Sequence, residues 1–577
     1  MRNLWKLRSP SPHASTLARE TGLSLLEAQL LIHRGVSERN SVATFLSPRL
    51  SNLIDPMLLK DMDAAVDLIV RALEEREHIT VYGDYDADGL TATALLLNFF
   101  SDLGIPASFY IPNRFTEGYG LNLDAVKKIA KRQGGVIITV DCGTANHNEI
   151  AQAQALGMRV VVTDHHQVPE DFSPLCPVVN PHRPDSAFPF QHLAGVGVAF
   201  FLAITIRAAL REKGWFKNRP ETDLRDYLDL VTLGTVADMV PLLDQNRILV
   251  KTGLERIHRT LCPGIYALQQ DADIGPSPIT PYDVAFKLAP RLNASGRLGD
   301  AETGILALTT NQPDLAKDLA GQLSAMNSER QSIERHILEE IEEIIASMDG
   351  LKNRRTLIFS GKGWHRGVLG IVASRLVDKH HRPALVLDVQ DGAATGSGRS
   401  IPGFNLYQAL TRLEHLFERF GGHYHAVGFS MKASNVETLA RELETFAQDQ
   451  LSDDDMVPAL EIDAQITLPE LFRDRVSGLE AMSPFGPGNP EPLLYAHALQ
   501  VIESRIVGEN HLKLRVQQES SLMEAIGFDL GGKHSLENQT IDMVFVPEIN
   551  RWQGYEKVQL RIIDLEKSGQ PLRALGG

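Results

Sequence analysis

Residues 78–89 read His78-Ile79-Thr80-Val81-Tyr82-Gly83-Asp84-Tyr85-Asp86-Ala87-Asp88-Gly89. The apolar, β-branched start of this segment is typical of a buried strand, and a helix-forming run from Leu90 to Phe100 follows the acids. The three aspartates therefore lie on a turn from strand to helix, which is a usual place for an active site in a parallel α/β sheet. Carboxylates at alternate positions repel one another unless a cation lies between them. Metal chemistry is the leading hypothesis for this segment.

The main alternative for the acidic turn is a calcium-binding EF-hand loop. Asp84, Asp86, Asp88 and Gly89 match loop positions 1, 3, 5 and 6 of that motif. Position 12 should be a bidentate Glu, but here it is Leu95. An EF-hand loop also follows a helix, whereas this turn follows a β-branched run. The sequence thus disfavours calcium, and a solvated acidic turn without an ion is the other alternative.

The composition is that of a globular protein with several domains. The chain has 577 residues, 43% of them hydrophobic and 23% charged, so three or four domains are expected. Its three cysteines, Cys142, Cys176 and Cys262, include no CxxC pair, which argues against a disulfide framework or a structural zinc and fits the cytoplasm. We expect no signal peptide and no membrane segment, because the longest apolar stretch, 193–206, reads as a buried helix. The net charge of −16 argues against broad non-specific binding of nucleic acid, but a local basic groove remains compatible with it.

The hydrophobic pattern predicts an α/β protein with a parallel-sheet lobe, a second α/β lobe and a small β-barrel. Residues 1–75 have helical periods, and from 76 to 310 β-branched runs at 79–82, 136–140 and 159–163 alternate with helical segments, which implies a parallel sheet. The clearest helix, Met326 to Met348, lies in a connecting region at 311–350, and a second α/β block follows at 351–450. A barrel is predicted in residues 456–577 from alternating runs at 460–466, 499–506, 512–516, 541–546 and 558–563.

Three further apolar runs end in potential metal ligands. Asp141 follows Val136 to Val140, Asp164-His165-His166 follows Val160 to Thr163, and Asp238 follows Leu230 to Ala237, which we interpret as a third strand. The carboxyl edge of one parallel sheet would collect all these side chains. Carboxylates with imidazoles suit Mg²⁺ or Mn²⁺, and they outnumber the ligands that one octahedral ion needs. We therefore expect two ions about 3.5–4 Å apart, bridged by one Asp.

Each of these signals has an ordinary explanation when it is taken alone. An Asp after a strand is often a helix cap, and a His-His pair is often simple packing. Cys142, beside Asp141, reads as a small wall residue because no second thiol is near it in sequence. The joint pattern is much less easily explained by chance, so the metal hypothesis is preferred.

Four segments carry groups that could bind a phosphate. Glycine lets backbone amides approach a phosphate, and Arg and Ser add donors. We interpret Arg291 to Arg297 as a Gly/Ser turn and Gly421-Gly422-His423 as the end of a helix. The candidate residues are Arg114, Arg291, Arg297, Ser397, Arg399 and His423. The sequence has no Walker A, GxGxxG or GxSxG motif, so nothing supports nucleotide-driven work, hydride transfer or serine hydrolysis. Metals on one lobe and anion donors on the other suggest phosphodiester hydrolysis in the cleft between them.

Taken together, these motifs closely resemble the DHH–DHHA1 phosphoesterase superfamily and, within it, the bacterial exonucleases specific for single-stranded DNA. The resemblance extends from about residue 40 to the C-terminus, and the predicted barrel resembles the OB domain of those enzymes. It also rests on the segments Ala194–Ala199, Gly234–Asp238, Arg291–Arg297 and Trp364–Val368. After Gly421-Gly422-His423 the chain reads Tyr424-His425-Ala426, where the family usually has smaller residues, so the shape of that pocket wall is left open.

The resemblance implies 5′→3′ release of mononucleotides from single-stranded DNA in recombination and repair, with two Mn²⁺ or Mg²⁺ ions. The implied metal ligands are Asp86, Asp88, Asp141, His165, His166 and Asp238, with Asp84 either a ligand or a brace and Asp164 orienting the histidines. Arg114, Arg297, Ser397 and Arg399 would hold the 5′ phosphate or nearby backbone, and Arg291 is a weaker candidate. The implied catalytic residues are Asp141, His165 and His423. Single-strand binding protein and a helicase are implied partners of a monomer that does not bind membranes.

Two other functions remain as alternatives. A different DHH phosphoesterase would act on oligoribonucleotides or cyclic dinucleotides, but the chain length and the β-rich tail argue against it. A non-catalytic DNA-binding protein would have no need of repelling carboxylates beside a phosphate.

Overall fold

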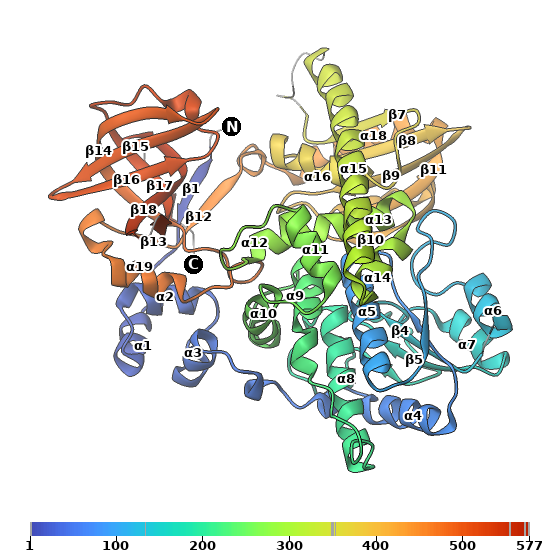
Figure 1. The fold of residues 1–577 in the computed structure, drawn as a ribbon. Coiled ribbons are helices and arrows are strands. Elements are labelled where there is room, and N and C mark those ends of the chain that lie inside the picture. The colour runs from blue at the N-terminus through green and yellow to red at the C-terminus, as the bar shows by residue number, and fades with distance from the viewer. Residues whose placement is uncertain are drawn as a thin grey trace. The chain divides into compact units, whose positions relative to one another are not determined.

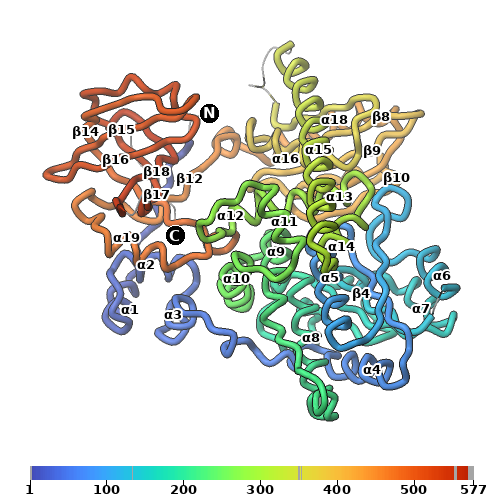
Figure 2. The backbone as a smooth tube through the Cα atoms, viewed as in Figure 1, coloured from blue at the N-terminus to red at the C-terminus, as the bar shows by residue number. Residues whose placement is uncertain are grey.

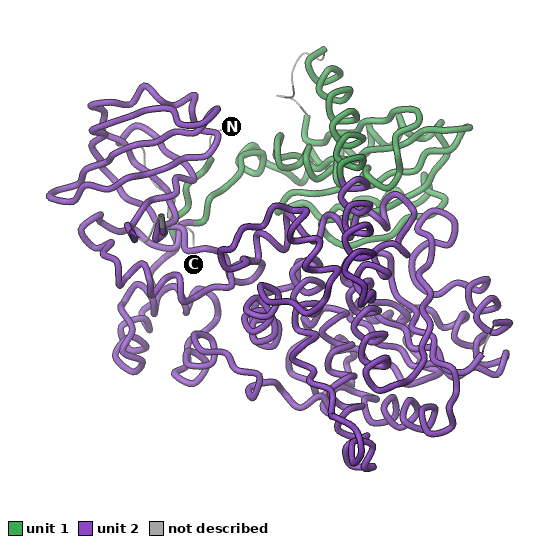
Figure 3. Tube along the Cα trace, viewed as in Figure 1, with its two compact units in different colours: residues 1–7, 328–461, 572–577 green, residues 8–327, 462–571 purple. Residues whose placement is uncertain are grey.

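The computed structural model describes residues 3–132, 134–347, 351, 354–552, 555–569 and 573–574. The chain forms two compact units (Figure 3). One contains residues 1–7, 328–461 and 572–577, and the other contains residues 8–327 and 462–571. The second and larger unit carries the acidic turn.

A parallel sheet organises residues 79–179 of the larger unit. Its strands are β3 (Ala107–Tyr110), β2 (Ile79–Tyr82), β4 (Val136–Val140), β5 (Arg159–Thr163) and β6 (Val178–Val179), in that order. Every neighbouring pair is parallel. The chain leaves β2 towards β3 on one side and returns to β4 on the other, so the carboxyl ends of β2 and β4 form a topological switch point. The predicted parallel sheet is therefore confirmed, and its switch point lies where the acids begin.

Helices cover both faces of this sheet because successive strand residues point to opposite sides. Ile138 and Val140 of β4 pack into a core shared with α4 (Met62–Glu75), α5 (Ala87–Asp102), α8 (Gly195–Glu212) and α9 (Leu228–Ala237). Ile137, between them, packs into a second core with α6 (Leu123–Arg132) and α7 (His147–Ala155). Figures 1 and 2 show the two groups of helices on either side of the strands.

Two predictions for this part of the chain were wrong. Residues 230–237 form the helix α9 and not a strand, because a short, wholly apolar run fits a buried helix as well as a buried strand. Residues 291–297 lie in the helix α13 (Ala289–Leu298) and not in a turn. Helix α13 continues a π-helical turn, Val284–Leu288, and ends at Gly299, whose left-handed backbone with φ 95° stops it. The loop-like residues Asn293, Ser295 and Gly296 thus stay within a helix.

A closed barrel forms the C-terminal part of the larger unit. Its strands are β14 (Leu494–Val507), β15 (His511–Gln518), β16 (Ser521–Gly527), β18 (Tyr555–Lys567) and β17 (Thr540–Trp552), and pairing of β14 with β17 closes it. The predicted barrel is confirmed, but strand β16 was missed because Glu524, Ala525 and Gly527 favour strands weakly. The short β13 (Ala464–Gln465) pairs with β14 in parallel. Residues 459–462, predicted in the barrel, form β12 in a separate small sheet with β1 (Leu4–Leu7) and β19 (Arg573–Ala574).

The N-terminal segment divides between two cores. Helices α1 (Ala14–Thr21), α2 (Leu25–His33) and α3 (Arg39–Leu46) bury Leu17, Leu31 and Phe45 against the barrel. Helix α4 belongs instead to the core of the parallel sheet. The helical prediction for residues 1–75 holds for these helices and was wrong at β1, while Met1 and Arg2 lie outside the described residues.

The smaller unit contains a five-stranded mixed sheet. Its order is β10 (Phe417–His423), β11 (Ala426–Lys432), β9 (Ala393–Arg399), β8 (Ala384–Gln390) and β7 (Leu357–Gly361), with only the β7–β8 pair parallel among these strands. Helices α17 (Leu406–Arg412) and α18 (Val436–Gln450) share one core with it, and α16 (Leu369–His380) shares another with α15 (Pro313–Ser347). Gly421-Gly422-His423 ends a strand, so its assignment to a helix end was wrong; glycine pairs are equally common where a strand bends.

The predicted long helix is confirmed as α15, although it begins earlier, at Pro313. Its first part belongs to the larger unit and the remainder, from Ser328, to the smaller one. Met348 and the rest of 348–350, which the prediction included, lie outside the described residues. None of the described helices combines the length and the apolar character needed to cross a bilayer.

Candidate metal and phosphate site

The turn from β2 to α5 is shaped by its own acids and glycines. Asp86 is the N-cap of α5, and its Oδ1 accepts hydrogen bonds from the amides of Asp88 and Gly89 at 3.0 and 3.1 Å. A Cβ on Gly89 would lie 2.6 Å from the carbonyl oxygen of Asp84, so the turn requires glycine there. Asp84 is buried, and its Oδ1 has no hydrogen-bond partner among the described residues. Burial and the charge of Asp86 raise the pKa of Asp84 well above its usual range.

Asp88 points from α5 to the first turn of α8. Its two carboxylate oxygens accept hydrogen bonds from the amides of Gly195 and Val196 at 2.6 and 2.8 Å. These amides belong to the helix turn that has no intrahelical partners, and the positive end of the helix dipole favours an anion there. Burial, followed by the charge of Asp86, nevertheless raises the pKa of Asp88 to about 7. The helix terminus holds Asp88 in place but does not remove the repulsion among the acids.

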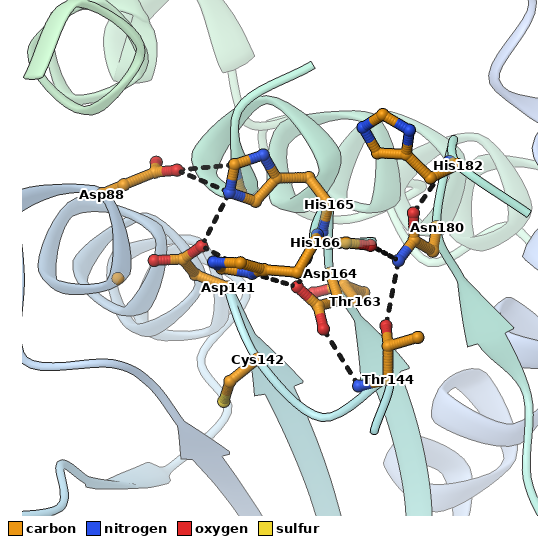
Figure 4. Close-up of polar contacts among 12 residues, drawn as sticks. Asp88, Asp141, Cys142, Thr144, Thr163, Asp164, His165, His166, Asn180 and His182 are labelled. Carbon is orange, nitrogen blue, oxygen red and sulfur yellow. Dashed lines mark hydrogen bonds and ion pairs between the residues drawn. The ribbon is translucent and has the colours of Figure 1, made fainter. Parts of the chain in front are cut away.

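Asp141 follows β4 in an unusual backbone conformation. Its φ of 59° is left-handed, which is uncommon for a residue with a side chain and is often found at functional sites. Its Oδ1 lies 3.1 Å from His165 Nε2 (Figure 4). Neither atom has a hydrogen-bond partner among the described residues, although both are buried. Because buried polar atoms are rarely left unpaired, these two atoms are candidate metal ligands.

Asp164 orients the two histidines that follow it. Its Oδ1 accepts hydrogen bonds from the amides of His165 and His166 at 2.7 and 3.1 Å and from His166 Nδ1 at 2.8 Å. Its Oδ2 accepts one from the Thr144 amide at 2.9 Å (Figure 4). Burial would raise the pKa of Asp164, but the His166 hydrogen bond and the charges of both histidines hold it well below its usual range. Asp164 therefore stays ionised and holds His165 and His166 in place at the end of β5.

The two histidines differ in charge. Burial, followed by the positive charge of His166, lowers the pKa of His165 to about 4, so His165 is neutral at pH 7 and can act as a ligand. Burial opposes protonation of His166 as well, but its hydrogen bond to Asp164 raises its pKa to about 9. A cation bound nearby would lower this value, because it would repel the proton.

Asp238 completes the site from the end of α9. It occupies the C-cap position, and its Oδ2 lies 3.6 Å from His165 Nε2. Burial, with the charges of Asp88 and Asp86, raises the pKa of Asp238 well above its usual range. Although α9 is a helix, its C-terminal end reaches the same edge as the strand ends.

Three overlapping groups of these side chains could each hold a metal ion. Within each group the ligand atoms lie within 4.8 Å of one another. Asp141 belongs to two of the groups and His165 to two, which is the sharing that a pair of neighbouring ions requires. The groups are Asp141–His165–His166, Asp88–His165–Asp238 and Asp84–Asp86–Asp141. The donors and the unpaired oxygens of Asp84 and Asp141 fit Mn²⁺ or Mg²⁺.

Two arginines lie near Tyr85 of the acidic turn. Arg114 stacks over the ring of Tyr85, with its guanidinium 5.0 Å from the ring centre. Burial and the charge of Asp84 raise the pKa of Tyr85 to about 12, and the charges of Arg114 and Arg297 partly oppose this rise. Helix α13 packs closely against the turn, since a Cβ on Gly296 would lie 2.1 Å from the Tyr85 carbonyl oxygen. This packing places Arg297, the next residue of α13, near enough to Tyr85 for its charge to act on that hydroxyl.

Arg291 of the same helix points elsewhere. Its guanidinium donates hydrogen bonds to Ser324 Oγ at 2.9 Å and to the Lys287 carbonyl at 2.5 Å, and it lies 3.8 Å from the Asp271 carboxylate. These contacts tie α13 to α15 and α11 (Pro263–Asp271). They favour a structural role for Arg291 over its predicted role in binding phosphate.

Ser397, Arg399 and His423 lie together on one face of the sheet in the smaller unit. Residues opposite one another on neighbouring strands share a face, and this face belongs to β9, β11 and β10. A Cβ on Gly421 or Gly428 would meet nothing within 4 Å, so the glycines leave an open surface beside the polar side chains. The paired rows are Ser397–Gly428–Gly421 and Arg399–Ala426–His423.

Sequence profiles of three domain families match successive parts of the chain. The DHH family N-terminal domain matches residues 78–235, the DHHA1 domain matches 353–449, and the RecJ OB domain matches 462–564. The single-stranded-DNA-specific exonuclease RecJ of Bacillus subtilis (strain 168) is 36% identical over 582 residues, which cover 99% of this chain and 72% of that protein. The corresponding protein of Escherichia coli (strain K12) is 36% identical over 525 residues, covering 88% of this chain and 90% of that protein.

The chain belongs to the RecJ family. The crystal structure of RecJ in complex with Mn²⁺ from Thermus thermophilus matches it with a TM-score of 0.83 at 30% identity, covering 99% of this chain and 80% of that chain. The corresponding Mg²⁺ complex matches with a TM-score of 0.77 at 28% identity, covering 100% and 80%. The predicted DHH, DHHA1 and OB architecture is therefore confirmed.

In this RecJ family member, every predicted metal ligand falls into at least one of the three candidate groups. Their roles as ligands stay predictions, as do the phosphate-binding roles of the arginines and the catalytic role of His423. Sequence reasoning missed Tyr119, whose hydroxyl reaches His166 and the Asp141 backbone, and Asn293, whose side chain accepts a hydrogen bond from the Ala87 amide at 2.8 Å. The only sequence signal for Tyr119 is its position between two glycines, in Gly118-Tyr119-Gly120.

Proposed function

We propose that this chain is a metal-dependent exonuclease that removes mononucleotides from single-stranded DNA in the 5′→3′ direction. The observation that carries the proposal is the set of three candidate metal groups, which are linked because each of Asp141 and His165 belongs to two of them. This set occurs in a member of a family named for single-stranded-DNA-specific exonucleases. The metal complexes of the Thermus protein support Mn²⁺ or Mg²⁺ as the cofactor. A non-catalytic binding protein would gain nothing from unpaired, buried carboxylate oxygens.

The residues that would hold two ions are Asp84, Asp86, Asp88, Asp141, His165, His166 and Asp238, with Asp141 as the shared ligand. When bound, the ions would lower the pKa of an attacking water and offset negative charge on the phosphate. The chain itself fixes the donors: the start of α8 holds Asp88, and Asp164 holds both histidines. Folding already holds these donors in place, so they need little reorganisation when substrate binds.

Anion donors outside the metal site would bind the DNA strand. Arg114 and Arg297 lie beside the acidic turn, and Arg can bind a phosphate with two parallel hydrogen bonds. Ser397 and Arg399 would bind the 5′ phosphate or nearby backbone through the open face of the DHHA1 sheet, and His423 would donate to the scissile phosphate. Recognition of a terminal phosphate would set the register at one nucleotide per cut.

We also propose further properties that rest on the family resemblance alone. The protein would act as a cytoplasmic monomer in recombination and repair, together with single-strand binding protein and a helicase. The alternative of a phosphodiesterase for oligoribonucleotides or cyclic dinucleotides is disfavoured by the match of residues 462–564 to the RecJ OB domain.

A nuclease assay with two label positions tests the proposed function. Single-stranded DNA, duplex DNA and short RNA, each labelled at either the 5′ or the 3′ end, are incubated with Mn²⁺, Mg²⁺ or chelator. We expect a 5′ label to be released at once as mononucleotide and a 3′-labelled strand to shorten in steps. Both should occur only with single-stranded DNA and only in the presence of metal.

The Asp141→Ala variant is the control for the metal site. It should abolish nucleotide release while DNA binding, measured by fluorescence anisotropy, stays close to that of the wild type. Full activity in this variant would refute the metal assignment. Preference for short RNA would favour the phosphodiesterase, and DNA binding without any metal-dependent cleavage would favour the accessory protein.

A further inference from the structure

Tyr119 lies on a loop that is fixed on both sides of it. Gly118 and Gly120 have left-handed backbones with φ of 81° and 78°, so the chain turns sharply before and after Tyr119. Before it, Glu117 accepts hydrogen bonds from Tyr110 Oη at 2.6 Å and from the Asn113 amide at 2.8 Å. After it, the carbonyl oxygen of Gly120 accepts a hydrogen bond from Tyr82 Oη at 2.9 Å. The loop therefore presents Tyr119 in a defined place.

The hydroxyl of Tyr119 touches the ends of two neighbouring strands. It lies 3.2 Å from the carbonyl oxygen of Asp141, which follows β4, and 2.9 Å from Nδ1 of His166, which follows β5. The Tyr119 and His166 rings meet edge to face, with their centres 5.3 Å apart. The Tyr119 side chain thus connects Asp141 and His166, two of the proposed metal ligands.

The chemistry of these contacts decides which atom donates. A carbonyl oxygen can only accept, so Tyr119 donates its proton to Asp141 and can only accept from His166. The Asp164 carboxylate also accepts from His166 Nδ1, at 2.8 Å. Nδ1 therefore carries a proton and lies between two acceptors, which fixes the ring orientation of His166.

We propose that Tyr119 is a positioning residue that fixes the His166 ring and the strained backbone of Asp141 relative to each other. The inference rests on the proposed function only in taking these two residues as metal ligands. The left-handed conformation of Asp141 is unfavourable for a residue with a side chain, so it persists only where surrounding contacts hold it. The hydrogen bond from Tyr119 to the Asp141 carbonyl is one such contact, and it is made by a residue outside the strand.

A different role for Tyr119 would be direct contact with DNA, because the residue is 48% exposed. The two roles differ in what they change. A positioning residue alters the affinity for metal in the absence of DNA and lowers kcat. A DNA contact alters the KM for DNA and leaves the affinity for metal unchanged.

The test compares Tyr119→Phe with wild type and with Tyr110→Phe as a matched control. Tyr110→Phe also removes one tyrosine hydroxyl that bonds to this loop, through Glu117, but that hydroxyl touches none of the proposed ligands. Free Mn²⁺ is measured by electron paramagnetic resonance during titration of each protein without DNA, and unfolding in chelator checks that each variant is folded.

We expect Tyr119→Phe to weaken Mn²⁺ binding about ten-fold or more, the size of effect that loss of a partner behind a metal ligand usually has. Its kcat at saturating Mn²⁺ should fall while KM for single-stranded DNA changes less than about two-fold, and Tyr110→Phe should match wild type. Unchanged Mn²⁺ affinity, or a rise in KM alone, would overturn the inference.

The same data separate this inference from the proposed function. If wild type binds Mn²⁺ but does not cut single-stranded DNA, the proposed function fails, and weaker Mn²⁺ binding by Tyr119→Phe would still support the inference. If wild type cuts single-stranded DNA and Tyr119→Phe binds Mn²⁺ equally well, only the inference fails.

Discussion

Gly195, the first residue of α8, allows the helix to approach Asp141, and replacing it with alanine should disturb the proposed metal site. A Cβ at this position would lie 2.7 Å from Asp141 Cβ, 2.8 Å from its Oδ1 and 2.9 Å from its Cγ. The amide of Gly195 also donates to Asp88 at 2.6 Å, so α8 cannot move away without weakening that hydrogen bond. The added methyl group must therefore displace Asp141, Asp88 or both.

The size of the displacement follows from these distances. Ordinary contact begins at 3.4 Å, so Asp141 Oδ1 would have to move by about 0.6 Å from its 2.8 Å position. Misplacement of a catalytic group by about 1 Å can reduce rates by roughly 100-fold. We expect Gly195→Ala to reduce kcat by about 10- to 100-fold and to lower the free energy of unfolding by about 1–3 kcal/mol through overpacking.

Gly197→Ala is the matched control, two residues further along the same helix. A Cβ at Gly197 would meet only Leu193 Cδ2 at 3.4 Å and Leu193 Cβ at 3.7 Å, which are ordinary contacts. Because alanine favours a helix interior over glycine, this variant should be more stable by up to about 1 kcal/mol and fully active. The assay combines urea unfolding in chelator with single-turnover cleavage of single-stranded DNA at saturating Mn²⁺. If both variants retain wild-type kcat and stability, the close packing of Asp141 on Gly195 does not constrain the site.

Three other predictions concern charge. Asp229→Asn should stabilise the protein by about 2–3 kcal/mol more at pH 7.5 than at pH 4. Burial raises the pKa of Asp229 to about 6, so the folded state binds more protons than the unfolded state between the ordinary pKa of about 3.9 and 6. The stability of the wild type therefore falls as pH rises through that window, and the variant avoids this loss. Asparagine can still accept from the Leu230 amide and can donate to the Thr260 hydroxyl, and equal changes in unfolding free energy at both pH values would contradict the reasoning. Asp238→Asn should raise the free energy of unfolding in chelator by about 1 kcal/mol or more, since it removes one of several repelling acids, and it should reduce the extra stabilisation by Mn²⁺. Thermal unfolding with and without Mn²⁺ measures both effects, and a loss of stability in chelator would refute the prediction. Arg399→Ala should weaken binding of 5′-phosphorylated single-stranded DNA about 10-fold more than binding of 5′-hydroxyl DNA in anisotropy titrations, and equal losses would contradict a terminal-phosphate role.

Three of the five strands of the parallel sheet could be predicted from the sequence almost to the residue, whereas the edge strands β3 and β6 were missed. The runs at 79–82, 136–140 and 159–163 coincide with β2, β4 and β5, because each is rich in β-branched residues, almost wholly buried and followed directly by glycine or aspartate. The failures share a cause, which is that local composition does not determine the element when tertiary packing does. Residues 230–237 are apolar enough for a strand or a helix, and residues 291–297 have turn-forming side chains that α13 uses for its contacts with the acidic turn.

The members of the site could be predicted better than its geometry. Residue type and position after apolar runs were enough to select eight candidate acids and histidines, and the family resemblance then set Asp164 apart from the seven implied ligands. The contacts between segments distant in sequence could not be predicted in the same way. Asp88 contacts Gly195 at the start of α8, which lies 107 residues away, and Ala87 contacts Asn293, which lies 206 residues away. The pairing of Ser397 with Gly428 and of Gly428 with Gly421 likewise depends on strand register, which one sequence does not specify.

Asp238 illustrates why the candidate ligands could be predicted to lie together although part of the fold assignment was wrong. It was expected at the end of a strand and lies instead at the C-cap of a helix, where the negative end of the helix dipole makes a carboxylate unfavourable. Three features therefore act against its charge: burial, the charges of Asp88 and Asp86, and the helix end. An acid in such a position weakens the metal-free protein, so the proposed bound cation, and not folding stability, would account for its placement. The proposed metal site calls for a carboxylate at this edge of the sheet, and either a strand or a buried helix can place it there.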